Sequence, residues 1–542
     1  MRSTHFLNVL MVRLAMRDYS RFRTQMPRAR EIQDRIIKRI VSRNVRSKFG
    51  ALHGFSNITN YKSFRKNISI SDYEDYRPYV QQMDRPESRI LTAEKTLLFE
   101  PTSGSTSPTK FIPYTRGLRK EFFRAINPWL VDVYRRRPEL LSGRSYWSIS
   151  PPVTQSHPME TSVPVGFETD SAYLSRFSRR LVERTFVTSQ ALKSEREVKG
   201  FCHRLSVCLL AAGDLALVSV WNPTAFLILL DYIRAERESL LDALEKGFPR
   251  DSERFIPPSP ERCRTLRRLF AHNPVPFSEV WPNLSFISCW ADGANRTYVE
   301  RLRSLFPDTE IQGKGLVATE GIISIPFAGK CYVPAYQSHF FEFLPEGEEK
   351  ECCLLHELSI GGSYRVVLTT SGGFYRYLLG DVVTVSGQYD GLPLLQFVSR
   401  DKVLDHFGEK LHVGHVQPAV TRAVASLGRE IAFLLFGFEL TGDDGFYCLY
   451  LEMAEVMTAA LQEKLRRERD NLTASLHENF HYAHALGTRQ LRPLRIFVID
   501  GGGTEAYFQR LSERGTKVGD IKTEAVSLLS DWSKFFLGSY LT

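Results

Sequence analysis

The chain has 542 residues, of which 43% are hydrophobic and 24% are charged, and its formal net charge is +10. This composition lies near the globular average, which excludes a wholly disordered chain, and the length predicts two or three domains. The longest apolar stretch, residues 207–233, is interrupted by Asp214, Asn222 and Pro223, so no membrane-spanning helix is expected. Arg13 and Arg17 break the apolar pattern of the first residues, which therefore does not resemble a secretory signal.

The basic excess is concentrated in residues 12–48, where a solvated helix face explains it most simply. Only Tyr19 and Phe22 lie among these charges, and a surface that binds single-stranded nucleic acid would offer more aromatic side chains, so we expect no nucleic-acid partner. The eight cysteines form no CxxC pair, and buried free thiols in a reducing compartment are the expectation. We therefore predict a cytoplasmic protein without a membrane or nucleic-acid partner.

The first hundred residues predict helices followed by a loop between two strands. Apolar side chains repeat at helical spacing over residues 28–49, which indicates an amphipathic helix. Residues 69–74 resemble a short strand that leads into a helix capped by Asp72. Apolar residues 97–99 and 111–114 flank a polar run, so a loop held between two strands is predicted there.

The middle of the chain alternates strands with helices. Residues 215–220 are typical of a buried strand and residues 224–233 of a helix. A strand over residues 284–290, a helix over 296–305 and a strand over 310–313 follow. This alternation predicts a parallel α/β sheet.

The remainder is richer in β-structure. Residues 339–385 contain short strands with Gly-rich turns, which favour an antiparallel sheet or a small barrel. After Arg400, a strand pair over 431–438 and 446–451, a helix over 458–480 and a strand over 494–499 suggest an α+β domain. We therefore predict an N-terminal domain over residues 1–400 and a C-terminal domain over residues 401–542.

The first chemically suggestive motif is the polar run over residues 102–110. Its small and hydroxyl residues allow backbone amides and side chains to approach phosphate oxygens, and Lys110 adds positive charge. The candidate phosphate-binding residues are Thr102, Ser103, Gly104, Ser105 and Thr106. The spacing is not that of a P-loop, and by itself the run is as well explained by an ordinary loop.

Two further motifs follow at long intervals. Ala318, Thr319 and Glu320 come shortly after the predicted strand at 310–313, and a carboxylate beside a nucleotide phosphate is a natural Mg²⁺ ligand. Residues 375–381 read YRYLLGD, and Asp381 after Gly380 could accept hydrogen bonds from ribose hydroxyls. Taken singly, a cap by Thr319 is the better explanation of the first of these motifs, and a plain turn at the strand end is the alternative for the second.

Taken together and in order, the three runs resemble the nucleotide motifs of the adenylate-forming superfamily. In detail they resemble the Gretchen Hagen (auxin-responsive promoter) acyl acid–amido synthetases, in their bacterial form. Residues 102–115 are similar to that family's TSGTT…IPYT signature, 311–320 to its second motif, and 375–381 to its YRYxxGD. Short matches at 49–55, 72–76, 221–224 and 407–411 extend the resemblance from about residue 30 to the C-terminus.

The chain departs from the family pattern in three places. Ser107-Pro108 replaces a Ser-Gly step, and Leu378 stands where plant members often have Arg. Residues 515–524 resemble the late GxxxGQxKxP segment, with Asp520 and Glu524 at the positions of Gln and Pro. The resemblance makes Lys522 the adenylation lysine, with Lys517 as the alternative.

The resemblance implies a large N-terminal domain with parallel and mixed sheets and a β-barrel-like subdomain, followed by a smaller, mobile α+β domain. It implies a monomeric, ATP- and Mg²⁺-dependent ligase that joins a carboxylic acid to an amine, plausibly an amino acid, through an acyl-adenylate. Glu320 would hold Mg²⁺, Asp381 the ribose with help from Arg400, and residues around 160–225 the acid. A coenzyme A ligase and a catalytically inactive nucleotide-binding relative are the alternatives.

Overall fold

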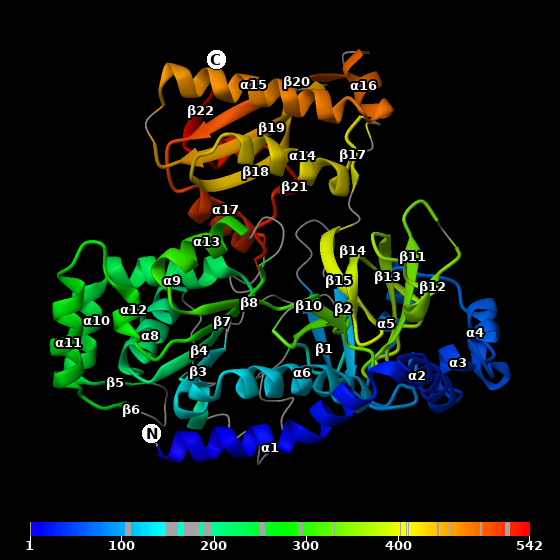
Figure 1. Ribbon diagram of the computed structural model, residues 1–542. Coiled ribbons are helices and arrows are strands. Elements are labelled where there is room, and N and C mark those ends of the chain that lie inside the picture. Colours follow the sequence, from blue (N-terminus) through cyan, green and yellow to red (C-terminus); the bar gives the residue numbers. More distant parts are fainter. Residues whose placement is uncertain are drawn as a thin grey trace.

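A computed structural model describes residues 2–102, 110–147, 161–166, 184–187, 198–249, 255–291, 296–329, 331–348, 350–400, 403–407, 409, 411–441, 444–455, 457–487, 490–514 and 521–541. In Figure 1 the elements from α14 to β22 form an upper lobe above the larger lobe built by α1 to β15. The predicted α/β class is confirmed.

Long helices at the N-terminus form the base of the larger lobe. Helix α1 (Arg2–Thr24) packs along α6 (Arg116–Arg136), and α2 (Ala29–Arg43) buries the predicted apolar face. The predicted helix over 28–49 is instead two helices, because α2 ends at Arg43 and α3 (Lys48–Leu52) begins after Ser47. The hydroxyl of Ser47 accepts a hydrogen bond from the Gly50 amide and thus caps the second helix.

The next elements lead to the polar loop. Helix α4 (Tyr61–Asn67) is followed by α5 (Tyr73–Gln81), whose predicted cap Asp72 accepts hydrogen bonds from Glu74 N and Asp75 N at 2.8 and 3.3 Å. Strands β1 (Thr96–Thr102) and β2 (Lys110–Thr115) pair antiparallel. The residues on both sides of the polar run are therefore strands, as predicted.

A parallel sheet has the described order β3-β4-β7-β8. Its strands are β3 (Arg144–Trp147), β4 (Leu215–Ser219), β7 (Phe286–Cys289) and β8 (Glu310–Gly313). The connecting helices include α8 (Val198–Ala211), α9 (Pro223–Ala235), α10 (Arg237–Lys246), α11 (Pro260–Phe270), α12 (Phe277–Val280) and α13 (Arg296–Leu305). All β4 residues are buried, which explains their continuous apolar run.

An antiparallel sheet of order β12-β11-β13-β14-β15 completes the larger lobe. Its strands are β11 (Phe340–Pro345), β12 (Cys353–Leu354), β13 (Ser363–Thr369), β14 (Tyr377–Tyr389) and β15 (Leu392–Arg400). The hairpin of β9 (Ser324–Phe327) and β10 (Cys331–Pro334) lies against β15. This sheet accounts for the β-rich region predicted over 339–385.

The upper lobe is a mixed sheet of order β21-β18-β19-β20-β22 covered by helices. Its strands are β18 (Ile431–Thr441), β19 (Asp444–Met453), β20 (Leu491–Ile499), β21 (Val526–Ser530) and β22 (Gly538–Tyr540). The helices are α14 (Val413–Ser426), α15 (Ala459–Leu476), α16 (Phe480–Gly487) and α17 (Gly503–Glu513). The helix predicted over 458–480 ends at Leu476, and α16 begins at Phe480.

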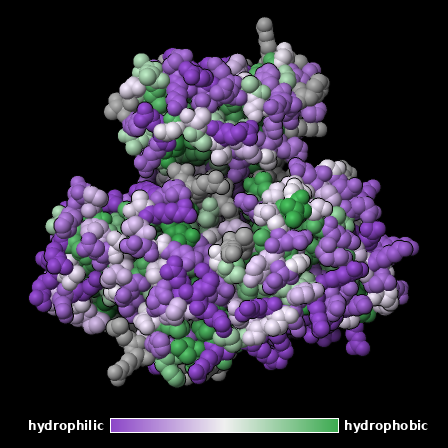
Figure 2. Space-filling view, in the orientation of Figure 1, coloured by the Kyte–Doolittle hydropathy of each residue, from purple (hydrophilic) through white to green (hydrophobic). Residues whose placement is uncertain are grey.

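The surface in Figure 2 is mainly hydrophilic, with hydrophobic side chains gathered in small patches. The apolar side chains of the two lobes form separate buried clusters, although Ile228 of α9 packs against the C-terminal cluster that includes Tyr507 of α17. Among the described helices, none combines the length and hydropathy that a bilayer crossing requires.

Candidate active site

Glu320 lies in a tight turn shortly after β8. Val317 and Ile322 form a β-bridge, and between them the amides of Ala318 and Gly321 bond each other's carbonyl groups at 3.0 and 3.2 Å. Only 8% of Glu320 is exposed. The turn thus presents a nearly buried carboxylate near the carboxyl end of the parallel sheet, where open α/β sheets bind their ligands.

One tyrosine connects all three motifs. The Lys110 ammonium donates a hydrogen bond to the Tyr377 hydroxyl at 3.2 Å, and that hydroxyl donates to Glu320 Oε1 at 3.2 Å. Burial, together with the charge of Glu320, raises the pKa of Tyr377, so the phenol remains protonated and able to donate. Lys110, Glu320 and Tyr377 come from three segments far apart in sequence, and their side chains form a continuous polar chain.

Strand β2 holds this chain in place. The Lys110 ammonium also lies over the Tyr73 ring, 5.6 Å from its centroid, and the amide of Phe111 donates to the Tyr73 hydroxyl at 2.7 Å. The Tyr114 hydroxyl donates to the carbonyl oxygen of Thr319 at 2.7 Å. The IPYT segment therefore follows the first motif in sequence and also contacts the second motif through Tyr114.

Asp381 and Arg400 are directly opposite each other in the pairing of β14 with β15. Asp381 is 4% exposed and lies within β14, not at the turn that a Gly-Asp step suggests. The preceding Gly380 has φ of 80°, a left-handed conformation that glycine adopts at little cost, and the register of β13 against β14 shifts nearby. This irregularity sets the direction in which the strand presents Asp381.

A buried histidine, His339, contacts the backbone next to the Glu320 turn. His339 Nε2 lies 3.1 Å from the amide of Ile322, which can only donate, so Nε2 accepts and Nδ1 carries the proton. Nδ1 then donates to Glu121 Oε2 at 3.1 Å, and the Ser371 amide donates to the same oxygen at 3.0 Å. Glu121 and His339 are 1% and 0% exposed, so this pair fixes the backbone that carries Glu320.

Arg376 and Glu342 form a buried ion pair inside the third motif. Arg376 Nη2 lies 2.9 Å from Glu342 Oε1, and Arg376 Nη1 donates to the Ile68 carbonyl at 2.9 Å. The Tyr61 hydroxyl donates to the same Glu342 oxygen at 2.8 Å. Burial raises the pKa of Glu342, and the charge of Arg376 opposes that shift. The arginine of YRY is thus a structural brace between β11, β14 and the segment after α4.

The segment that carries Lys522 is bound to the larger lobe. The side-chain amide of Asn222 donates to the Ile521 carbonyl at 3.0 Å and to the Thr523 hydroxyl at 3.2 Å. The Lys522 ammonium lies over the Trp290 ring, 4.5 Å from its centroid. Trp290 follows β7 and Asn222 follows β4, so Lys522 sits at the carboxyl end of the parallel sheet, the end from which β8 leads to Glu320.

Glu320 is the carboxylate best placed to bind a divalent cation. Among described residues its side chain has one hydrogen-bond partner, Tyr377, which bonds Oε1 and leaves Oε2 for another ligand. No group of three or more potential ligands from His, Cys, Asp and Glu occurs within the described part of the chain. Such a site suits Mg²⁺, which commonly binds through one or two carboxylates together with phosphate oxygens and water.

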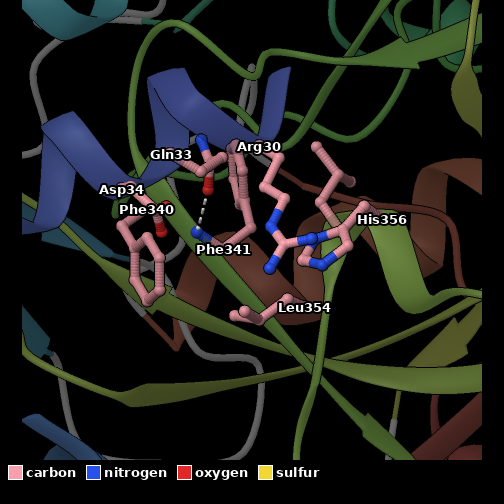
Figure 3. A pocket seen from close by; sticks show the side chains of 8 residues that line it. Arg30, Gln33, Asp34, Phe340, Phe341, Leu354 and His356 are labelled. Atoms are coloured by element: carbon pink, nitrogen blue, oxygen red, sulfur yellow. Dashed lines mark hydrogen bonds between the residues drawn. The ribbon is translucent and has the colours of Figure 1, made fainter. Parts of the chain in front are cut away.

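A small pocket elsewhere contains none of the motif residues. Figure 3 shows it between α2 and the β11–β12 region, where the Phe341 amide donates to Gln33 Oε1 at 2.8 Å. It is lined by Arg30, Gln33, Asp34, Phe340, Phe341, Leu354, Leu355 and His356. Its mainly structural contacts give no reason to place the chemistry there.

The structure brings together Lys110, Glu320 and Tyr377 of YRYLLGD, it holds Thr319 through Tyr114, and it places Asp381 opposite Arg400 in the sheet. Thr102 ends β1 opposite Lys110. Ser103, Gly104, Ser105, Thr106, Ser107, Pro108 and Lys517 lie outside the described residues, as do residues 167–174 of the expected acid region. The motif pattern did not reveal Tyr377 as the connection between the motifs, nor His339, because both act through contacts with residues far away in sequence.

Three family models match the chain in order: the GH3 family N-terminal domain over residues 18–311, the central domain over 332–400 and the C-terminal domain over 414–529. The chain is 21% identical to the probable indole-3-acetic acid-amido synthetase GH3.12 of Oryza sativa subsp. japonica, over 91% of this chain and 90% of that protein. It is 22% identical to the jasmonoyl–L-amino acid synthetase JAR4 of Nicotiana attenuata, with the same coverage of both chains.

Solved structures share the fold. The acyl acid amido synthetase AtGH3.15 in complex with 2,4-DB superimposes with a TM-score of 0.81 at 19% identity, covering 95% of this chain and 94% of that one. A 2-hydroxyisobutyryl-CoA ligase in the postadenylation state reaches 0.50 at 11% identity, covering 94% and 90%. The predicted adenylate-forming fold is therefore confirmed, and the three consecutive domain matches show that this chain belongs to the GH3 family.

Proposed function

We propose that this protein is an AMP-forming ligase that activates a carboxylic acid as an acyl-adenylate and transfers the acyl group to an amine. We propose an amino acid as that amine. The observation that carries the proposal is the chain of contacts from Lys110 through Tyr377 to Glu320, which joins the three nucleotide motifs at one place. The amido synthetase names of the relatives support the amide product over a thioester.

In the first step an oxygen of the acid attacks the α-phosphorus of ATP, a new O–P bond forms and pyrophosphate leaves. Negative charge grows on the α-phosphate, and Lys110 and Lys522 are the cations that we assign to it. Residues 102–106 would hold phosphate oxygens, with Ala318 and Thr319 beside the nucleotide, and Asp381 with Arg400 would hold the ribose. Mg²⁺ bound through Glu320 would neutralise phosphate charge as pyrophosphate departs.

In the second step the amine nitrogen attacks the acyl carbon, the C–N bond forms and AMP leaves with the oxygen that came from the acid. The amine loses a proton to solvent or to a base in the site. We propose that residues 401–542 form a mobile domain whose reorientation removes Lys522 and opens a path for the amine. We also propose that the protein acts as a cytoplasmic monomer, which is compatible with its free cysteines among the described residues.

Lys522→Ala tests the assignment of the adenylation lysine. Because the ammonium lies over the Trp290 ring, which is not part of the nucleotide motifs, ATP binding should change little. Acid-dependent ATP–pyrophosphate exchange should fall by at least about 100-fold, as expected for a lost transition-state charge contact. Exchange at the unmodified rate would remove Lys522 from the mechanism, and Lys534→Ala, which removes an exposed lysine paired with Asp531, is the matched control.

The ATP–pyrophosphate exchange assay, followed by analysis of the products, also identifies the acid and amine substrates. Exchange over a broad panel of acids identifies those that are activated, and each is then incubated with ATP and either mixed amino acids or coenzyme A. We expect amides and AMP from the amino acid mixture. Thioester formation would replace the proposal with a coenzyme A ligase, and failure of every acid to support exchange would favour an inactive relative.

A further inference from the structure

Lys314, the first residue after β8, places an ammonium group among neutral partners. Its Nζ donates to the hydroxyl of Ser219 at 2.7 Å and lies 3.3 Å from that of Ser288. Ser219 is the last residue of β4 and is 4% exposed, and Ser288 lies near the end of β7 and is 0% exposed. Within the described ranges, no carboxylate forms an ion pair with Lys314. A cation that is largely withdrawn from water normally has such a partner, because losing water is costly for a charge.

Two indole rings flank the ammonium. Nζ lies 5.8 Å from the centroid of the Trp129 ring and 5.2 Å from that of Trp221. Contacts of this kind stabilise a cation by about 0.5–2 kcal/mol, less than a buried charge loses with its water. Burial accordingly lowers the pKa of Lys314 to about 8, so the ammonium still predominates at neutral pH but is poorly compensated.

The Lys314 ammonium retains one donor for an incoming group. An ammonium has three N–H donors, and the described partners accept from two of them. Trp221 is 36% exposed, which is high for an indole beside a buried cation, whereas Trp129 is 8% exposed. A ligand that approaches the carboxyl ends of β4, β7 and β8 therefore meets an apolar ring face and a cation that forms no ion pair with any described carboxylate.

Lys314 is also distinct from Lys110, one of the two cations assigned to the reacting centre. Lys110 is bonded to Tyr377, and Tyr377 to Glu320, whereas the Lys314 ammonium contacts none of these side chains. The reacting carboxylate belongs near Lys110 and Glu320, where the nucleotide motifs meet. An acid substrate that also bound Lys314 would therefore need a second oxygen acceptor. That oxygen would be separated from the reacting carboxylate by the apolar part of the molecule.

We propose that Lys314 is a specificity-determining residue that binds a second anionic or acceptor oxygen of the acid substrate, while the exposed face of Trp221 packs against its ring or apolar body. The substrate class is thus a flat acid with a second carboxylate or a phenolic oxygen. This inference rests on the proposed function, because it assigns the reacting carboxylate to the nucleotide motifs.

Lys314→Met tests the inference, since methionine is unbranched, of similar reach and uncharged. Binding of benzoate, 4-hydroxybenzoate and benzene-1,4-dicarboxylate is measured by titration calorimetry with the full chain. The unmodified protein should bind at least one of the two substituted acids about 10- to 100-fold more tightly than benzoate, the range given by a charged hydrogen bond. Lys314→Met should reduce this ratio to about one. Lys246→Met, which removes an exposed lysine on α10, should retain it.

Thermal unfolding separates this role from a purely structural one. Without ligand, Lys314→Met removes an uncompensated charge, so its melting temperature should equal or exceed that of the unmodified protein. A lower melting temperature would show that the ammonium is a structural hydrogen-bond donor and would overturn the inference. Equal affinities for the three acids, or binding of none of them, would overturn it as well.

Pyrophosphate exchange with the same three acids distinguishes this inference from the proposed function. One outcome is that benzoate supports exchange as fast as the two substituted acids, in the unmodified protein and in Lys314→Met alike. That result would agree with the proposed ligase activity and would contradict the specificity role of Lys314. A Lys314-dependent affinity ratio without any exchange would retain the binding site and contradict the ligase.

Discussion

At the scale of single residues, Tyr377 holds the candidate site together. Its hydroxyl accepts from Lys110 and donates to Glu320, so it orients both a cation and a carboxylate. Removing it as Tyr377→Phe leaves the ring stack with Phe374, whose centroid lies 4.7 Å away, but frees both partners to move. We expect pyrophosphate exchange to fall roughly 10- to 100-fold, since a misoriented charge loses transition-state stabilisation.

The matched control for that prediction is Tyr389→Phe, on the same strand β14 but away from the motifs. It should leave exchange within about twofold of the unmodified protein, as expected when no bond to a reacting group is lost. A Tyr377→Phe protein with the same exchange rate as Tyr389→Phe would show that the contact between the motifs has no catalytic consequence. Circular dichroism melts of both variants should show folding transitions like that of the unmodified protein.

At the scale of elements, the Arg376–Glu342 pair braces β11 against β14. Arg376→Met leaves a fully buried carboxylate without its cation, which should reduce the free energy of unfolding by about 3–5 kcal/mol. Urea denaturation measures the change. Arg65→Met is the control, because Arg65 pairs with Glu351 at an exposed site and should cost no more than about 1 kcal/mol.

A second variant tests the cause of that loss. Adding Glu342→Gln to Arg376→Met removes the stranded charge, so the double variant should recover part of the stability. A double variant no more stable than Arg376→Met alone would mean that the arginine acts through its bond to the Ile68 carbonyl and not by neutralising Glu342.

Elements and local caps were predictable to a large extent from sequence, and long-range contacts were not. The cap at Asp72 and the strands β4, β7 and β8 follow from local residue types and spacing. The break between α2 and α3 was missed because apolar periodicity continues across it while a cap at Ser47 restarts the helix. The roles of Tyr377, His339 and Lys314 depend on which distant segments they meet, and no local pattern encodes that.

At the scale of the whole molecule, Asn222 connects the two lobes. Its Oδ1 accepts from Thr224 N and caps α9, while its Nδ2 donates to the segment that carries Lys522. Asn222→Asp preserves the cap and removes the donors. We expect hydrogen exchange to accelerate about tenfold or more in residues 521–524, since two hydrogen bonds of roughly 1 kcal/mol each are lost, with α9 unchanged.

Asn222→Ala is the companion variant, because it loses both the cap and the donors. It should increase exchange at the start of α9 as well as in residues 521–524. Equal protection of residues 521–524 in Asn222→Asp and the unmodified protein would show that the lobes are held together by other contacts, such as that of Lys522 with Trp290.

The most direct test of the acyl-adenylate is the fate of the acid's own oxygen. An acid that supports exchange is labelled with ¹⁸O in both carboxylate oxygens and converted to its amide, and the released nucleotide is analysed by mass spectrometry. Attack of the acid on the α-phosphorus predicts one ¹⁸O atom in each AMP formed and none in pyrophosphate. Unlabelled AMP, or label in inorganic phosphate with release of ADP, would contradict activation through an acyl-adenylate.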